Sequence, residues 1–306
     1  MTSVEALEAG IMIGPPMRRA ALDIDALFQA ILPDPPDARR RLYDAMRYAA
    51  VGGGKRLRPL LVLASARLFE VPRGQAIRAG LAVECVHVHS LIHDDLPCMD
   101  DDDLRRGKPT VHRAFDEATA VLAGDALLAL AFEILGDPAT HPSGTVRAEL
   151  VCELAKAAGA GGMAGGQMLD LSPPEEEERI DLDGVTRLQR LKTGALIGWC
   201  VEAGAIMGRA PHDLRTSLRG YAHCLGLAFQ IADDLLDHGG EEAKVGKRLG
   251  KDAEQGKETF VSLLGPARAR RQAKLLVAQA EDHLRPFGED ARLLAAIARY
   301  AVERDR

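Results

Sequence analysis

Apolar residues recur along the chain every three or four positions, which is the period of a helix that packs one face against a core. The stretch from Phe115 to Leu135 is the clearest example. The positions that this period places on one side of a helix are Ala118, Val121, Leu122, Asp125, Leu128, Phe132 and Leu135. The same pattern predicts long helices over residues 76–95, 215–237 and 267–284. Alternating runs typical of strands do not occur in the sequence, and neither does an Asn-Gly hairpin signal.

The loops and the domain organisation follow from the residues between these stretches. Pro59 suits the first position of a helix that continues through Leu60 to Phe69, because its missing N–H and fixed φ cost nothing there. Proline, glycine and polar residues indicate loops at 33–36, 136–144, 172–183 and 238–251. None of these loops reads as a linker between domains. We therefore expect one all-α domain, a helical bundle over residues 1–306, with a loosely ordered segment at 1–20.

Composition and charge narrow the class of protein. The chain has 306 residues, of which 47% are hydrophobic and only 4% aromatic, so its core must be mainly aliphatic. A net charge of −6 argues against nucleic acid as the main partner. Five widely spaced cysteines without a CxxC pattern predict neither a disulfide framework nor a zinc site, and favour a reducing, cytoplasmic location. No uninterrupted apolar run of about 18 residues occurs, so we expect no membrane span.

The first acidic cluster is His93-Asp94-Asp95-Leu96-Pro97-Cys98-Met99-Asp100. On an ideal helix, Asp94 and Asp100 would point about 120° apart. Pro97 cannot donate to the helical ladder and also disfavours helical angles at the residue before it, so the helix must end or bulge there and could return Asp100 to Asp94. A solvated turn after an acidic helix end is the simpler alternative, but negative charge there opposes the helix dipole. Two adjacent carboxylates would instead favour a divalent cation such as Mg²⁺.

The second acidic cluster is Gln230-Ile231-Ala232-Asp233-Asp234-Leu235-Leu236-Asp237. Asp233 and Asp237 are four residues apart, so they share a helix face, where like charges destabilise the helix unless something neutralises them. A further cation is the simplest explanation. The alternative is a polar stripe on a surface helix, which we discount because this helix is apolar on most sides.

Basic residues next to glycines lie before and after these clusters. The segment 52–59, Gly-Gly-Gly-Lys-Arg-Leu-Arg-Pro, joins a flexible backbone to a helix start and is typical of an anion-binding loop. It lacks the GxxxxGK[ST] pattern of a Walker loop. Lys192, Lys247 and Lys257 also have glycine neighbours within two residues, and Arg105 and Arg106 follow the first cluster. Each signal is weak alone, but together they indicate divalent metals that hold a polyphosphate between basic side chains.

The blocks that carry these residues resemble those of trans-isoprenyl diphosphate synthases, the polyprenyl synthetase family, and most closely the bacterial farnesyl diphosphate synthases. The matching blocks are 52–59, 84–110, 120–128, 164–171, 191–197, 226–237 and 246–259. They follow the order of the family and span most of the chain. The resemblance implies an isoprenoid synthase-type helical bundle around a deep central cavity, and usually a homodimer.

The resemblance also implies a site residue by residue. Asp94 and Asp100 are expected to bind two Mg²⁺ ions with support from Asp95, and Asp233 to bind a third ion with Asp237 in its outer sphere. Mn²⁺ is an alternative metal. The allylic diphosphate is expected to contact Arg105, Lys192 and Lys247, and secondarily Gln167, Thr193, Gln230 and Lys257. The residues expected around isopentenyl diphosphate are Lys55, Arg58, His87 and Arg106.

The reaction of this family sets the expected activity and product. Ionisation of an allylic diphosphate gives a cation that alkylates isopentenyl diphosphate, and the family extends its product along the helix of the first cluster. The residue five before the first Asp often sets the floor; here it is His89, beside Ser90, at about 7 Å of helix from Asp94. Short-chain members often have an aromatic residue there and longer-chain members a smaller or more flexible one, so His89 is intermediate and departs from the short-chain pattern. We expect farnesyl diphosphate, with geranylgeranyl diphosphate as the alternative.

Three other functions share part of this pattern. A class I terpene cyclase would have the fold and the first cluster but would not need a second diphosphate pocket. A catalytically silent partner subunit would be expected to lose carboxylates, whereas both clusters are complete here. A phosphate-binding scaffold would be distinguished by an assay for isopentenyl-dependent release of diphosphate.

Overall fold

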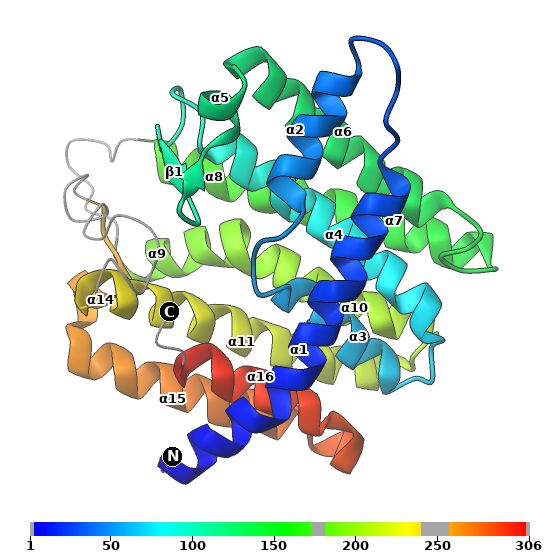
Figure 1. Cartoon of the computed structure of the whole chain (residues 1–306). Coiled ribbons are helices and arrows are strands. Elements are labelled where there is room, and N and C mark those ends of the chain that lie inside the picture. The colour runs from blue at the N-terminus through cyan, green and yellow to red at the C-terminus, as the bar shows by residue number, and fades with distance from the viewer. Residues whose placement is uncertain (1–2, 173–180, 240–256, 304–306) are drawn as a thin grey trace.

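The computed structural model describes residues 3–172, 181–239 and 257–303, with side chains from Met12 onward. The described chain is helical almost throughout (Figure 1), which confirms the predicted all-α class. The helices are α1 (Ser3–Ile31), α2 (Arg40–Ala50), α3 (Leu57–Arg67), α4 (Arg73–Asp94), α5 (Val111–Ala114), α6 (Glu117–Gly136), α7 (Gly144–Ala158), α8 (Met163–Leu171), α9 (Leu182–Gln189), the π-helix η1 (Arg190–Gly194), α10 (Ala195–Met207), α11 (His212–Gly239), α14 (Phe260–Leu264), α15 (Pro266–His283), the 3₁₀-helix η2 (Arg285–Ala291) and α16 (Arg292–Glu303). Two short strands, β1 (Leu104–Arg105) and β2 (Lys108–Pro109), pair antiparallel.

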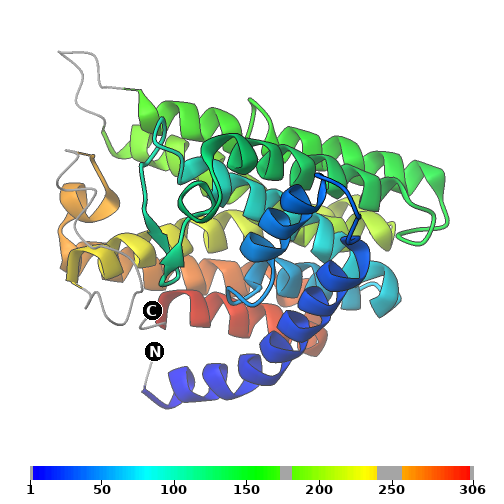
Figure 2. The same ribbon diagram turned by 45° about the horizontal axis from the view of Figure 1, so that its top comes forward.

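The bundle is built around helices that are apolar on nearly every side. Helix α3 is buried at every residue from Pro59 to Ala66 and packs against α4 and α10. Gly204 of α10 allows the closest approach, because a Cβ there would lie 2.3 Å from the Ala66 nitrogen. Helix α4 continues the packing to α6, and α11 packs against α10, α15 and α16. Helix α1 crosses the outside of this bundle over α3, α4 and α16 (Figure 2).

Two element boundaries differ from those expected. Helix α3 begins at Leu57, two residues before Pro59. Arg56 has a left-handed φ of 51°, so the helix cannot extend further toward the N-terminus. Pro59 still lies in the first turn, where it removes no helical hydrogen bond. The N-terminal segment enters the structure as α1, which buries Ile13 and Ala20; the looseness expected for residues 1–20 stays a prediction.

Helix α6 buries a different side from the one that its pattern predicts. Its buried residues are Thr119, Ala120, Ala123, Gly124, Leu127, Leu130, Ala131, Ile134 and Leu135. Val121 and Leu122, expected on the packed side, are 40% and 57% exposed. Apolar residues also occupy the other sides of this helix, so the period predicts a helix but does not determine which side is packed. Length and composition would also let α6 cross a membrane, but half of the apolar stretch is buried inside the protein, as in a core helix.

Candidate active site

The first acidic cluster lies where α4 ends. The helix stops at Asp94, and the following turn brings Asp100 back so that its N–H donates to the Asp94 carbonyl over 2.8 Å. Burial raises the pKa of Asp94 to about 6; nearby Lys192 lowers it, while the neighbouring Asp100 carboxylate raises it. Two crowded, partly desolvated carboxylates gain most from a divalent cation, and their oxygen donors fit Mg²⁺.

Asp95 has a different task from its neighbours. It is only 2% exposed, and its Oδ1 accepts a hydrogen bond from Arg105 Nε over 2.6 Å. Burial raises the pKa of Asp95 and the Arg105 guanidinium opposes that effect. Asp95 therefore fixes Arg105 beside the acidic cluster; its expected support of the metal ligands stays a prediction.

A hairpin that the sequence pattern did not predict carries Arg105 and Arg106. Strands β1 and β2 are joined by Arg106 and Gly107, with φ of 54° and 75°. Two successive positive φ angles are typical of a type I′ turn, in which the first residue is usually Asn, Asp or Gly. The turn brings the Arg106 guanidinium against Gly54, where a Cβ would lie 2.7 Å from Nη2. Gly53 and Gly54 thus leave the space that Arg106 occupies.

A group of guanidinium groups surrounds His87. Burial is the main cause that holds the pKa of His87 well below its usual value, and Arg58, Arg106, Arg105 and Arg56 lower it further. The Nε of Arg58 is buried and lacks a hydrogen-bond partner within the described parts of the chain. Converging cations around a neutral imidazole form an environment that favours a polyanion such as diphosphate.

The glycine-rich loop is held by a group of charged residues that the sequence reasoning missed: Arg56, Glu84 and Asp25. Arg56 and Glu84 are each 2% exposed, and Arg56 Nη1 lies 2.6 Å from Glu84 Oε1. Arg56 Nη2 also lies 2.6 Å from Asp25 Oδ1, and the Gly52 N–H donates to the same carboxylate. A lone Glu within the apolar stretch 76–92 was the available signal, since a buried charge requires a partner.

The opposite wall contains Lys192 and Thr193, which lie in the π-helix η1 between α9 and α10. Gly166 of α8 approaches this turn so closely that a Cβ would lie 2.2 Å from the Lys192 nitrogen. Asp170, also on α8, binds Lys192 Nζ at 2.7 Å and Lys257 Nζ at 2.8 Å. Burial raises the pKa of Asp170, but the two lysines lower it by more, so the pKa lies below its usual value overall. Asp170, which the sequence reasoning also missed, holds both lysines in place.

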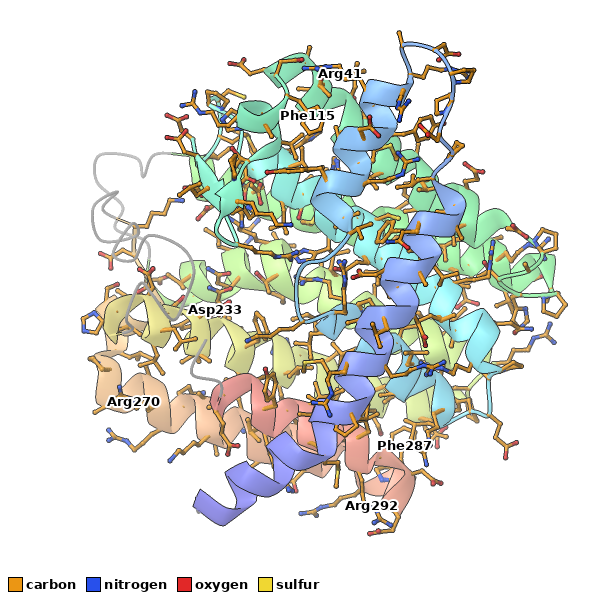
Figure 3. The ribbon with its side chains drawn as sticks, viewed as in Figure 1. Arg41, Phe115, Asp233, Arg270, Phe287 and Arg292 are labelled. Carbon is orange, nitrogen blue, oxygen red and sulfur yellow. The ribbon has the colours of Figure 1, made fainter. Side chains whose placement is uncertain are left out.

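The second acidic cluster lies on α11 (Figure 3 labels Asp233). Asp233 and Asp237 are partly exposed, whereas Asp234 is buried. Gln230 Nε2 and the Phe260 N–H donate to Asp234, which therefore joins α11 to the start of α14. Gln230 Oε1 in turn accepts a hydrogen bond from Thr193 over 3.2 Å. This chain of contacts links the second cluster to the wall that carries the lysines.

A cavity of about 410 Å³ lies between these walls. The site residues expected from the sequence that line it are Arg58, His87, His89, Ser90, Asp94, Gln167, Lys192 and Thr193. Gln167 is 8% exposed, and neither atom of its amide group has a hydrogen-bond partner among the described residues. Unsatisfied polar atoms facing a cavity of this size point to a polar ligand.

Other expected residues do not line this cavity. A separate pocket is lined by Asp95, Arg105 and Arg106. The lining residues of these two pockets do not include Asp100, Gln230, Asp233, Asp237 or Lys257. Lys55 is not among the cavity-lining residues; its Nζ lies 5.6 Å from the centre of the Tyr300 ring on α16. Lys247 lies outside the described residues. The structure therefore brings together Asp94 of the first cluster, Arg58, His87 and Lys192, and connects the second cluster through Thr193 and Gln230.

An all-helical bundle that arranges carboxylates and cations around one cavity defines a class of enzyme that binds diphosphate groups with divalent metal ions. The chain matches the polyprenyl synthetase family over residues 39–289. It is 47% identical over 269 residues to a farnesyl diphosphate synthase of Escherichia coli (strain K12), covering 86% of this chain and 89% of that protein. It is 45% identical to geranylgeranyl pyrophosphate synthase 11 of Arabidopsis thaliana, covering 85% and 73%.

Among solved structures, the crystal structure of an apo FPP/GFPP synthase from Zymomonas mobilis superposes with a TM-score of 0.86 at 56% identity. The match covers 97% of this chain and 99% of that one. The chain therefore belongs to the polyprenyl synthetase family, whose members use divalent metal to bind diphosphate, and it is a trans-prenyltransferase.

Proposed function

We propose that the chain condenses isopentenyl diphosphate head-to-tail with dimethylallyl or geranyl diphosphate to give trans-farnesyl diphosphate and pyrophosphate. The observation that supports this reaction best is the presence of two separate groups of cations, with one member of each, Lys192 and Arg58, lining the cavity. Lys192 and Lys257 share Asp170 on one side, and Arg58 and Arg106 act on His87 on the other. Two diphosphate substrates need two such places, whereas a terpene cyclase needs one.

Asp94, Asp100, Asp233 and Asp237 are the residues that we assign to metal binding, and their all-oxygen donor set fits Mg²⁺ better than a softer metal. Three ions are expected, with Mn²⁺ as an alternative. Bound Mg²⁺ supplies charge neutralisation for the diphosphate group.

The basic side chains perform the remaining electrostatic work. We assign Arg105, Lys192 and Lys247 to the allylic diphosphate, where fixed positive charge stabilises the charge that builds on the leaving group. Gln167, Thr193, Gln230 and Lys257 complete its surroundings. Gln167 supports this assignment because its buried amide lacks a partner among the residues described.

The isopentenyl diphosphate pocket is assigned to Lys55, Arg58, His87 and Arg106. Because the pKa of His87 is held well below its usual value by burial and by these arginines, His87 is neutral near pH 7 and offers a hydrogen bond rather than a charge. The departing diphosphate accepts the proton that the new carbon chain loses, so no carboxylate or histidine base is needed.

The cavity wall supports a fifteen-carbon product. His89 and Ser90 line the cavity next to Asp94, and five helical residues span about 7 Å, roughly one isoprene unit. Replacing His89 with alanine should open the floor and lengthen the products. If His89→Ala left the product distribution unchanged, His89 would not be the floor, and a geranylgeranyl product would have to be limited elsewhere.

We also propose a cytoplasmic homodimer. Val121 and Leu122 leave an apolar surface on α6, at 40% and 57% exposure, and apolar surface of this kind favours association. A symmetric pair would cover this surface on both copies at once. All five cysteines are free thiols, which agrees with a reducing compartment.

The decisive experiment is chromatography of the products formed from dimethylallyl and isopentenyl diphosphates with Mg²⁺. We expect two molecules of pyrophosphate for each farnesyl diphosphate formed, because two condensations extend dimethylallyl diphosphate to fifteen carbons, and no cyclic hydrocarbon. Asp94→Ala or Asp233→Ala should lower turnover about a hundredfold or more, as expected for loss of a group that stabilises charge. Near-normal turnover in either variant would contradict the assignment of the acidic clusters.

A further inference from the structure

A group of metal-ligating side chains apart from the carboxylates of the two acidic clusters lies between α4 and α6. It consists of His89, His93 and Asp125, whose ligand atoms all lie within 4.8 Å of one another. His93 Nε2 is 3.9 Å from Asp125 Oδ1, and the rings of His89 and His93 have centroids 4.5 Å apart. His93 directly precedes Asp94 of the first acidic cluster, but none of the carboxylates assigned to Mg²⁺ belongs to this group, and the proposed reaction gives His93 and Asp125 no role.

The spacing of the two histidines suits a metal. Four residues separate His89 from His93, so both imidazoles lie on one face of α4. Two histidines at this spacing on a helix are a recurrent zinc-binding arrangement when a third ligand comes from elsewhere. Asp125 is that third group, because it projects from α6, which packs against α4.

The backbone of α6 leaves room for this approach. A Cβ at Gly124 would lie 2.2 Å from His93 Nε2, so the imidazole can lie against α6 only because residue 124 is glycine. His93 Nε2 is 3.1 Å from the Val121 carbonyl, and a coordinate bond to a metal would replace that contact. His89 Nδ1 is buried and has no hydrogen-bond partner within the described residues, so the group contains a polar atom that still needs a partner.

The ligand atoms, which lie within 4.8 Å of one another, must move closer together to share an ion. Ligand atoms around a tetrahedral zinc ion lie about 3.3 Å apart, which is close to the 3.9 Å between His93 and Asp125. Asp125 is exposed and its side chain is 61% accessible, so its carboxylate can rotate toward the histidines. Three protein ligands would leave a fourth position for water.

We propose that His89, His93 and Asp125 bind one Zn²⁺-class ion, distinct from the magnesium ions of the acidic clusters. Nitrogen donors favour zinc, cobalt or nickel over magnesium, which prefers oxygen alone. The ion joins α4 to α6 at the cavity wall and fixes the His89 ring. The consequence, which rests on the proposed function, is that the ion restricts the space for the growing product and shifts the products toward shorter chains.

Cobalt binding tests the site without any prenyl substrate. Co²⁺ is titrated into the full chain in excess Mg²⁺, which occupies the carboxylate clusters, and its visible d–d absorption reports nitrogen ligation. We expect one Co²⁺ per chain that Zn²⁺ displaces. His89→Ala and the isosteric Asp125→Asn should each weaken binding by about tenfold or more, since even changes to supporting groups around a metal cost this much. His223→Ala, at an exposed histidine on α11, is the matched control and should bind normally.

Two results would overturn the proposal. One is equal Co²⁺ binding by the unaltered chain, His89→Ala and Asp125→Asn. The other is loss of the signal in excess Mg²⁺ or in Asp94→Asn, which would place the ion at the acidic cluster. Thermal unfolding of the metal-free variants shows whether each one is folded, and Asp125→Asn changes only an exposed group.

The product measurement separates this proposal from the proposed function. Added Zn²⁺ in the presence of Mg²⁺ should lower the ratio of twenty-carbon to fifteen-carbon products in the unaltered chain, but not in Asp125→Asn. An unchanged ratio would refute the effect on length even if the ion binds. A chain that binds Co²⁺ as expected but forms no prenyl product would refute the proposed function and leave the metal site standing.

Discussion

Glu84→Gln should destabilise the protein and weaken isopentenyl diphosphate binding at the same time. Arg56 and Glu84 are each 2% exposed, with their charged atoms 2.6 Å apart. Removing one partner of a buried pair costs about 3–5 kcal/mol, because the other charge stays buried without compensation. Asp25 keeps a 2.6 Å contact to Arg56, and glutamine retains an oxygen acceptor. We therefore expect the lower end of that range, about 3 kcal/mol.

The effect on binding follows from the position of Arg56 in the glycine-rich loop. Lys55 and Arg58 lie on either side of it in the sequence, and both are assigned to isopentenyl diphosphate. Loosening the loop should raise the KM for that substrate. The KM for the allylic diphosphate should change little, because Lys192 and Lys257 are held by Asp170 instead.

Urea unfolding and initial rates with each substrate varied in turn measure the two effects. The matched control is Glu149→Gln, which removes a carboxylate 2.8 Å from Arg215 where the Glu149 side chain is 39% accessible. A pair this exposed contributes about 1 kcal/mol or less. Equal stability of Glu84→Gln and Glu149→Gln, or a rise in the allylic KM alone, would refute the reasoning about the loop.

Three further predictions concern the site and the surface. Asp170→Asn releases Lys192 and Lys257 and should lower kcat about tenfold or more, since misplaced charged groups lose their effect on the transition state; an unchanged initial rate would show that they need no positioning. The pKa of Asp94 is about 6, so protons should compete with Mg²⁺ only below that pH, and calorimetry should give a Kd that rises about tenfold per unit there and is flat above; a Kd independent of pH would contradict this. Leu122→Asp should weaken self-association by about 2 kcal/mol or more, as seen by sedimentation, whereas Leu275→Asp, at a position 51% exposed on α15, should leave the mass unchanged; identical behaviour would place the interface elsewhere.

The helical class and the return of Asp100 to Asp94 could be predicted because both depend on local rules. The apolar period predicts helices. Pro97 has no N–H to donate, so it predicts that α4 ends close to Asp94, where the structure ends it. The packed side of α6 could not be predicted, since apolar residues occur on every side of it. The packed side of α6 is determined by its contacts with α2 and α4. No local sequence pattern contains those contacts.

Residues that act through long-range contacts were also invisible to local patterns. Asp170 meets Lys257 across 87 residues of sequence, and Arg56 meets Glu84 across 28. A single Asp or Glu in either stretch reads as an ordinary charged residue until the fold supplies its partner. The hairpin at Arg106 was missed because arginine is rarely the first residue of a type I′ turn.

The π-turn at Arg190–Gly194 makes the length of this segment as important as its composition. A helix advances about 100° per residue, so deletion of one residue on the N-terminal side of Lys192 would either rotate its side chain away from Asp170 or convert the wide turn into an ordinary one. A substitution within the segment keeps the number of residues, whereas Gly166, which packs against it, leaves no room for a side chain. Over evolutionary time the segment should therefore accumulate exchanges of one residue for another while rejecting insertions and deletions.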